Sequence, residues 1–309
     1  MDKILVTCYT DPDLDGFACA IAYAEFLNAT GTAAVPKFFG TPNVEARHLM
    51  QKFGFQYPDD VNPAGFDKII LVDASELRDL DGIIKPDNVI EIIDHRKVND
   101  SALFKNAKLQ LEFVGSAATL IAEKFHNAYV EISVPATTLL YGAIVSNTLN
   151  FRAQVTTDRD CLMAEWLNQK LCFGKDFTDD MFRAKSDMAG DNLAARIEGD
   201  FAWFSLGSKK IGVGQLEIMD GKDLIRGRKQ EILAILKRLQ SELKLDQIFL
   251  SIIDLGEGCN AFIADDPEMQ KLLSEVLGIT FNGGIAIRDG FIMRKEIVPL
   301  LKERLECIR

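Results

Sequence analysis

Residues 3–16, KILVTCYTDPDLDG, decide the fold of this chain of 309 residues. Their apolar run predicts a buried strand, which ends in a polar turn that holds Asp11, Asp13 and Asp15. The apolar pattern of residues 17–27 then predicts a helix. Because sites in an open α/β sheet form at the carboxyl ends of its strands, we expect a site at this turn. A solvated helix cap is the alternative for one Asp, whereas three together favour a bound cation that relieves their repulsion.

Two more apolar runs end in residues of the same kind. Asp73 ends the run at residues 68–73, and Asp94 and His95 end the run at residues 88–96. In a βαβ pattern, the carboxyl ends of parallel strands meet at one edge of the sheet. We therefore expect one edge to gather four side chains that bind metals: Asp13, Asp15, Asp73 and His95.

The length of the chain predicts two domains. Residues 185–192 show no helical or strand periodicity, so we place the boundary there, between domains at residues 1–186 and 192–309. The expected fold is α/β, with an N-terminal parallel-sheet domain, a smaller α+β C-terminal domain and an active site in the cleft between them. The remaining elements expected are a hairpin at residues 201–219, strands at 32–39, 247–254, 259–264 and around 279–294, and helices at 43–53, 115–127, 135–149, 157–172, 229–243, 267–277 and 298–306.

Composition excludes several classes of protein. The net charge of −11 opposes strong nucleic-acid binding, and no apolar run is long enough to span a membrane. The six cysteines form no CxxC pair, so we expect no zinc ribbon, and the absence of a signal peptide predicts a cytoplasmic protein.

Residues 211–214, IGVG, open no helix, so they predict close packing in a strand rather than a dinucleotide loop.

The metal site must be mostly oxygen-liganded, because the chain has only three histidines. Carboxylates suit Mn²⁺ and Mg²⁺, and one imidazole favours Mn²⁺. We expect one or two ions, with Asp73 as the bridging ligand of a pair. Such ions would activate water to attack a phosphoanhydride or a small phosphoester, which makes a small phosphorylated molecule the expected substrate.

Several other residues are candidates for binding that substrate. Arg96 follows His95, and Arg294 and Lys295 are placed at a strand end that could aim them across a cleft. Ser116 opens a predicted helix, where it either caps the helix or helps to cradle phosphate. Asn147 lies near the end of another helix, as a helix stop or as a group of the site.

Seven segments together resemble a known family over nearly the whole chain: PDLD at 12–15, LVD at 71–73, IDHR at 93–96, GSAAT at 115–119, IVSNT at 144–148, GVGQ at 212–215 and MRKEIVP at 293–299. They are similar to the DHH phosphoesterase superfamily, specifically to family II inorganic pyrophosphatases and exopolyphosphatases. The resemblance implies a DHH domain with metals at its strand ends and a C-terminal DHH-associated domain that supplies basic substrate ligands. It assigns Asp13 and Asp73 to one metal, and Asp15, Asp73 and His95 to the other. Asp94 is implied as a group that orients the site.

The chain departs from this family at four positions of the site. Tyr9 and Arg96 stand where the pyrophosphatases have histidines, Asn147 replaces an aspartate ligand, and Ala202 replaces a lysine. Met293 aligns with the first arginine of the final basic motif. These changes predict a phosphohydrolase of altered specificity, with one ion held firmly by Asp15, Asp73 and His95 and a second held weakly or not at all.

Two other functions stay open. One is a catalytically decayed protein that binds a phosphorylated ligand on the same fold. The other, ranked third, is a phosphodiesterase of oligonucleotides or cyclic dinucleotides, a branch that carries a Gly-Gly-Gly-His motif where residues 282–285 read NGGI. By analogy with the family, the chain could form a homodimer through the edge strand of its first sheet.

Overall fold

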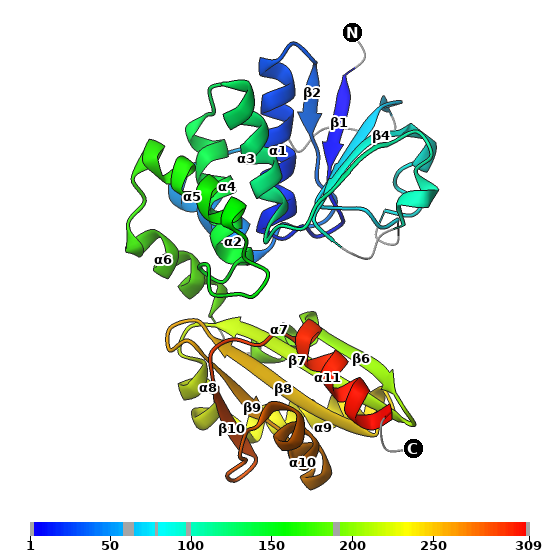
Figure 1. The fold of residues 1–309 in the computed structure, drawn as a ribbon, viewed down its shortest axis with the longest axis vertical. Helices are drawn as coiled ribbons and strands as arrows, with labels where there is room; N and C mark the ends of the chain where they lie inside the picture. The colour runs from blue at the N-terminus through cyan, green and yellow to red at the C-terminus, as the bar shows by residue number, and fades with distance from the viewer. Residues whose placement is uncertain (1–2, 58–64, 78–79, 97–99, 188–191, 307–309) are drawn as a thin grey trace. The chain divides into compact units, whose positions relative to one another are not determined.

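The computed structural model describes residues 3–57, 65–77, 80–96, 100–187 and 192–306. The chain forms two compact units, Met1–Ala184 and Lys185–Arg309, and each unit has its own five-stranded sheet (Figure 1). Within the expected boundary at residues 185–192, residues 188–191 lie outside the described ranges.

The sheet of the first unit is entirely parallel, with the strand order β2-β1-β3-β4-β5. Its strands are β1 (Ile4–Thr7), β2 (Ala34–Pro36), β3 (Ile69–Val72), β4 (Val89–Asp94) and β5 (Lys108–Leu111). All four residues of β3 are buried, as expected for a central strand covered on both faces. Because the strands share one direction, the carboxyl ends of β1, β3 and β4 lie at one edge.

The first unit also contains six α-helices and two short 3₁₀ helices among the described residues. They are α1 (Leu14–Ala29), α2 (Val44–Phe53), α3 (Ala117–Ala128), α4 (Val134–Asn147), α5 (Asp158–Leu171), α6 (Lys175–Lys185), η2 (Pro86–Asn88) and η3 (Ser101–Leu103). Of these, α1 and α3 pack on the sheet. Side chains cap several helix starts, as with Asp13 for α1 and Ser116 for α3. The mainly apolar α1 and α4 pack against each other and against α3, and this packing fixes where α1 and α3 begin (Figure 1).

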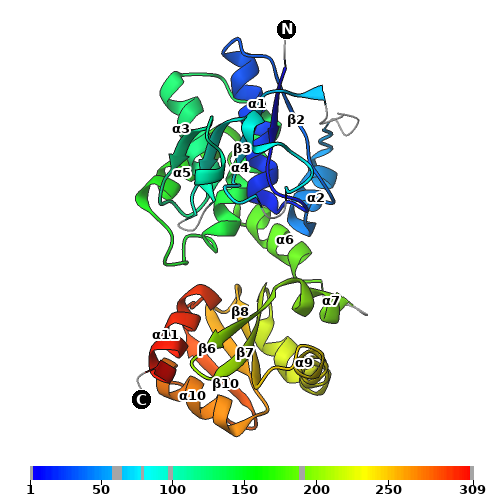
Figure 2. The same cartoon turned by 90° about the vertical axis from the view of Figure 1, so that its right-hand side faces the viewer.

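The second unit has a mixed sheet in the order β10-β9-β8-β7-β6, in which β7 and β8 are parallel and the other pairs are antiparallel. Figure 2 shows α9 and α11 on opposite faces of this sheet. Alternate residues of β8 serve the two faces: Leu250 and Ile252 pack on the α9 side, and Phe249 packs on the α11 side. The elements are β6 (Phe201–Leu206), β7 (Lys209–Ile218), β8 (Gln247–Asp254), β9 (Cys259–Ile263), β10 (Ile285–Asp289), α7 (Asn192–Gly199), α8 (Gly221–Gly227), α9 (Lys229–Glu242), α10 (Pro267–Leu277) and α11 (Arg294–Glu306).

The structure confirms the predicted fold class, an α/β unit with a parallel sheet followed by an α+β unit. The sequence did not predict β5, α6, α7 or α8. The final helix begins at Arg294 instead of near residue 298, so the predicted strand end at Arg294 and Lys295 is wrong. Among the described residues, no helix has both the length and the apolar character needed to span a membrane.

Candidate metal centre

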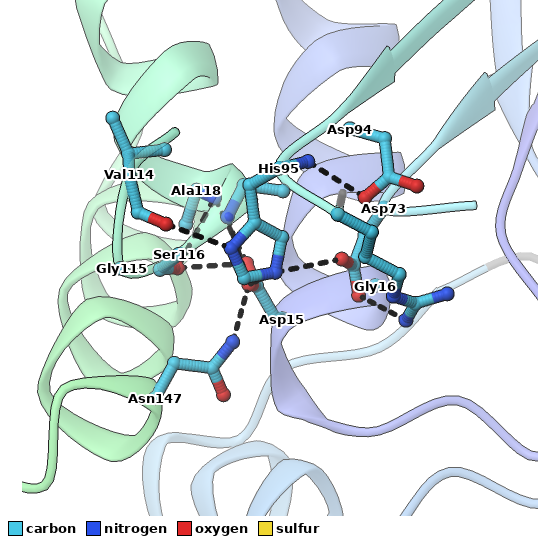
Figure 3. Close-up of polar contacts among 12 residues, drawn as sticks. Asp15, Gly16, Asp73, Asp94, His95, Val114, Gly115, Ser116, Ala118 and Asn147 are labelled. Carbon is cyan, nitrogen blue, oxygen red and sulfur yellow. Dashed lines mark hydrogen bonds and ion pairs between the residues drawn. The ribbon is translucent and has the colours of Figure 1, made fainter. Parts of the chain in front are cut away.

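Three of the four predicted metal ligands come together at the edge of the first sheet (Figure 3). Asp15 lies in the first turn of α1, Asp73 directly follows β3, and His95 directly follows β4. One ligand atom from each lies within 4.8 Å of the others. His95 Nε2 is 3.4 Å from Asp73 Oδ1 and 3.8 Å from Asp15 Oδ2.

The backbone at Asp73 turns its carboxylate into this group. Its φ angle is 51°, a left-handed conformation that Asp adopts more readily than most residues but that still costs on the order of 1 kcal/mol. Its N–H donates to the carbonyl of Ile93 at 2.8 Å, which holds the turn against the neighbouring strand. Such a conformation at the end of a buried strand is typical of functional sites.

The carboxylate of Asp15 is held by the N-terminus of α3 and by Asn147. The N–H groups of Ala117 and Ala118 donate to it at 2.9 and 2.8 Å, and the Ser116 hydroxyl donates at 2.9 Å. Asn147 Nδ2 donates to Asp15 Oδ2 at 2.6 Å. A helix N-terminus stabilises an anion, and here the anion is the side chain of Asp15.

This arrangement bears on the predicted phosphate cradle at the start of α3. Ser116 is fully buried and caps the helix, and its hydroxyl and the first helix amides already contact Asp15. The geometry therefore does not support direct substrate binding by Ser116. Substrate binding by Asn147, whose amide contacts Asp15, stays a prediction.

The ring of His95 is oriented by a backbone carbonyl. His95 Nδ1 lies 2.9 Å from the oxygen of Val114, and because a carbonyl oxygen only accepts, Nδ1 carries the proton of this bond. In the neutral ring, the lone pair of Nε2 then faces the two carboxylates, as a metal ligand requires. Burial lowers the pKa of His95, but Asp73 and Asp15 raise it more, to about 10.

The charges of the two aspartates show why a cation suits this place. The pKa of Asp73 is raised to about 7. Burial is the largest cause and the negative charge of Asp15 is the second, whereas the positive charge of Arg96 lowers this pKa. Burial also raises the pKa of Asp15. Asp73 Oδ1 is buried and has no hydrogen-bond partner among the described residues. Two carboxylate oxygens and one imidazole nitrogen fit Mn²⁺ or Mg²⁺, which would satisfy this orphaned oxygen.

The other predicted residues of the first unit lie around this group. Asp94 is buried, accepts from the N–H of His95 at 2.7 Å and from the hydroxyl of Ser75, and so positions the turn that carries His95 (Figure 3). Asp13 Oδ1 accepts from the N–H of Gly16 at 3.0 Å, and Asp13 is not part of the three-residue group. Arg96 Nη2 lies 3.6 Å from Asp73 Oδ2.

The two basic candidates of the second unit lie in the first turn of α11. Arg294 forms an ion pair with Asp200 at 2.6 Å, and its N–H donates to Gln215 Oε1 at 2.6 Å. Lys295 is exposed. Their role in substrate binding stays a prediction.

Sequence reasoning missed the residue that ties the start of α3 to that of α5. Asp160 is fully buried and accepts from the N–H of Gly115 at 2.8 Å, the N–H of Thr157 at 2.7 Å and the hydroxyl of Thr119 at 2.5 Å. The spacing of Thr157 and Asp160 is that of a capping box, so the local contact could have been found from sequence. Its contact with Gly115, 45 residues away, could not.

Two domain families match the chain. The DHH family, N-terminal domain, matches residues 3–144, and the DHHA2 domain matches residues 179–304.

Several relatives match the chain over almost its whole length. A manganese-dependent inorganic pyrophosphatase of Methanothrix thermoacetophila is 34% identical over 295 residues, which cover 94% of this chain and 88% of the relative. One of Bacillus subtilis is 28% identical over 309 residues, 99% of each chain. The crystal structure of the Methanococcus jannaschii putative family II inorganic pyrophosphatase has a TM-score of 0.72 and 27% identity, and the match covers 98% of this chain and 99% of that one. The chain therefore belongs to the DHH phosphoesterase family, in the family II inorganic pyrophosphatase branch that joins a DHH domain to a DHHA2 domain.

Proposed function

We propose that this chain is a divalent-metal-dependent phosphohydrolase that cleaves a small phosphoanhydride, with inorganic pyrophosphate as the first substrate to test. The observation that carries the proposal is the buried Asp15, Asp73 and His95 group, in which one oxygen of Asp73 lacks a partner among the described residues. The names of the relatives, manganese-dependent inorganic pyrophosphatases, support the choice of metal and of substrate.

In this proposal, Asp15, Asp73 and His95 hold the ion. When bound, a divalent ion supplies a Lewis acid and lowers the pKa of a water ligand into the physiological range. The chain fixes the ligands before that step, because α3 holds Asp15, the carbonyl of Val114 orients His95, and the αL turn aims Asp73. Three protein ligands leave further coordination positions for water and substrate.

The substrate is bound by cationic and polar side chains. Arg96 is the best placed of them in the first unit, since its side chain is 36% exposed and lies next to Asp73. A guanidinium can contact two phosphoryl oxygens at once, which both orients the substrate and neutralises its charge. We assign Arg294, Lys295 and Asn147 to the same task. Arg294 would have to exchange its contact with Asp200 for the substrate.

The test is phosphate release by the purified full-length chain, stripped of metal and reloaded with Mn²⁺, Mg²⁺ or neither. Pyrophosphate, tripolyphosphate and ATP are offered in parallel. We expect release with Mn²⁺ and none after Asp73→Asn, whereas Asp67→Asn, the same change at an exposed position, keeps the wild-type rate. Release that survives Asp73→Asn would refute the proposal.

Two other outcomes bear on the alternatives. Mn²⁺ binding without release from any of the substrates would favour the decayed, phosphate-binding protein. Hydrolysis of oligonucleotides, with no release from the three phosphoanhydrides, would favour the phosphodiesterase. A homodimer, a cytoplasmic location and the lack of nucleic-acid binding stay predictions.

A further inference from the structure

The two carboxylate oxygens of Asp73 face different partners. Oδ1 faces His95 Nε2 at 3.4 Å, on the side of the Asp15 carboxylate, and has no hydrogen-bond partner among the described residues. Oδ2 faces Arg96 Nη2 at 3.6 Å. When a carboxylate bridges two metal ions through both of its oxygens, each oxygen binds one ion, so in that mode the partner of Oδ2 decides whether a second ion can share Asp73.

Arg96 is held in this place by an aromatic ring. Its guanidinium carbon lies 5.0 Å from the centroid of the Tyr9 ring, within the range of a cation–π contact. The hydroxyl of Tyr9 accepts from the N–H of Asp13 at 3.2 Å, which fixes the ring against the turn that follows β1. Burial raises the pKa of Tyr9 well above its usual value, so the ring stays neutral beneath the cation. The Tyr9 ring therefore helps to fix the position of the positive charge of Arg96 beside Asp73.

A second metal ion on Asp73 would meet this fixed charge. To reach Oδ2, it would approach a guanidinium that cannot lose its proton, and like charges at this short separation repel each other. Asp13, another carboxylate of the turn that follows β1, uses Oδ1 to cap α1 through the N–H of Gly16. Tyr9 offers a neutral phenol hydroxyl in place of an anionic or imidazole ligand.

We propose that the centre binds one divalent ion per chain, and that Arg96, held by Tyr9, supplies the second positive charge beside Asp73. The inference rests on the proposed function, because it concerns the same centre. It changes the expected role of Asp73 from a bridge between two ions to a ligand that pairs one ion with one guanidinium. At this centre, the charge on the transferred phosphoryl group would then be met by one metal ion and Arg96, in addition to the basic side chains of the second unit.

The test counts Mn²⁺ ions per full-length chain by calorimetry and by electron paramagnetic resonance, without substrate. We expect one ion in the wild type. Arg96→Met removes the charge at similar length and is expected to admit a second, weaker ion that couples magnetically to the first. Arg96→Lys keeps the charge and is expected to stay at one. Arg304→Met, which removes a charge in the second unit, serves as the matched control and also stays at one.

The results separate this inference from the proposed function. Two ions in the wild type, or one ion in folded Arg96→Met, would overturn the inference and leave the metal-dependent function intact. No ion in any of the proteins would overturn both. Circular dichroism and thermal unfolding of each variant show that the counts refer to folded protein.

Discussion

Changing Asn147 to Asp should make the stability of this protein strongly dependent on metal. The amide of Asn147 donates to Asp15 Oδ2 at 2.6 Å, so the substitution brings a second carboxylate against a buried one. In the metal-free chain the two charges repel each other. With a divalent ion bound, the new carboxylate becomes a further anion beside the cation, and the repulsion is offset.

The contact gives the size of the effect. Losing a hydrogen bond to a charged acceptor costs about 1.5–3 kcal/mol. Two unit charges about 4 Å apart at an effective dielectric constant of about 20 repel by about 4 kcal/mol, and the pair can limit this cost by sharing a proton. We therefore expect metal-free Asn147→Asp to lose about 4–6 kcal/mol, a large part of the stability of a typical domain.

The assay is urea unfolding of the wild type and of Asn147→Asp, each in chelator and in saturating MnCl₂. We expect Mn²⁺ to restore most of the lost stability, so that the variant gains at least about 3 kcal/mol more from the ion than the wild type does. That difference corresponds to Mn²⁺ affinity that is higher by more than about a hundredfold. Asn127→Asp adds the same charge at an exposed position and should respond to Mn²⁺ as the wild type does.

One result would refute this reasoning. If Asn147→Asp loses the same free energy in chelator and in MnCl₂, no cation lies close enough to Asp15 to interact with position 147. The assignment of Asp15 as a metal ligand would then fall.

Three further predictions concern the rest of the chain. Asp160→Ala leaves the buried N–H of Gly115 and the part-buried N–H of Thr157 without their acceptor, so urea unfolding should show a loss of about 2–6 kcal/mol, and a loss below about 1 kcal/mol would contradict that role. Leu250→Ala opens a cavity beside β8 and should cost about 2–5 kcal/mol in the same assay, whereas exposed Leu162→Ala should stay within about 0.5 kcal/mol, and equal losses would contradict the described packing. Mn²⁺ at about one hundred times its dissociation constant should stabilise the wild type by about 2.7 kcal/mol, and a melting temperature that does not fall on chelation would count against a metal bound only by the folded state.

The sequence predicted the centre because Asp73 and His95 directly follow buried strands, and Asp15 starts the helix that follows another strand. The apolar runs before Asp73 and before Asp94 are long enough to identify as strands, and parallel strands must end at one edge. The sequence also predicted close packing for residues 211–214. The structure agrees, since a side chain added at Gly212 would meet Leu245 and Phe201 at 2.6 Å.

The missed elements are short and weakly patterned. Strand β5 lies at the edge of its sheet and buries none of its four residues fully, so it lacks the apolar run of a central strand. Helices α7 and α8 have eight and seven residues, too few to show a clear period, and tertiary packing holds them. The start of α11 was predicted too late, although Glu296 accepts from the N–H of Met293 at 2.9 Å in a capping contact whose spacing is visible in the sequence.

The contacts within the centre could not be predicted from local pattern. The hydrogen bond from Ser116 to Asp15 joins residues 101 positions apart, and that from Asn147 to Asp15 joins residues 132 positions apart. Sequence spacing shows that Ser116 opens a helix but not which anion the helix faces. For that reason a phosphate cradle and a simple cap stayed equally open until the fold was known.

The hold of α3 on Asp15 has a consequence for how manganese reaches this protein. Because helix amides, a hydroxyl and a carboxamide already fix that side chain, and Asp160 anchors the loop in front of the helix, the ion has little chain to organise on arrival. Loading should then be fast and should release little heat from ordering. The metal-free chain should therefore bind manganese without a folding step.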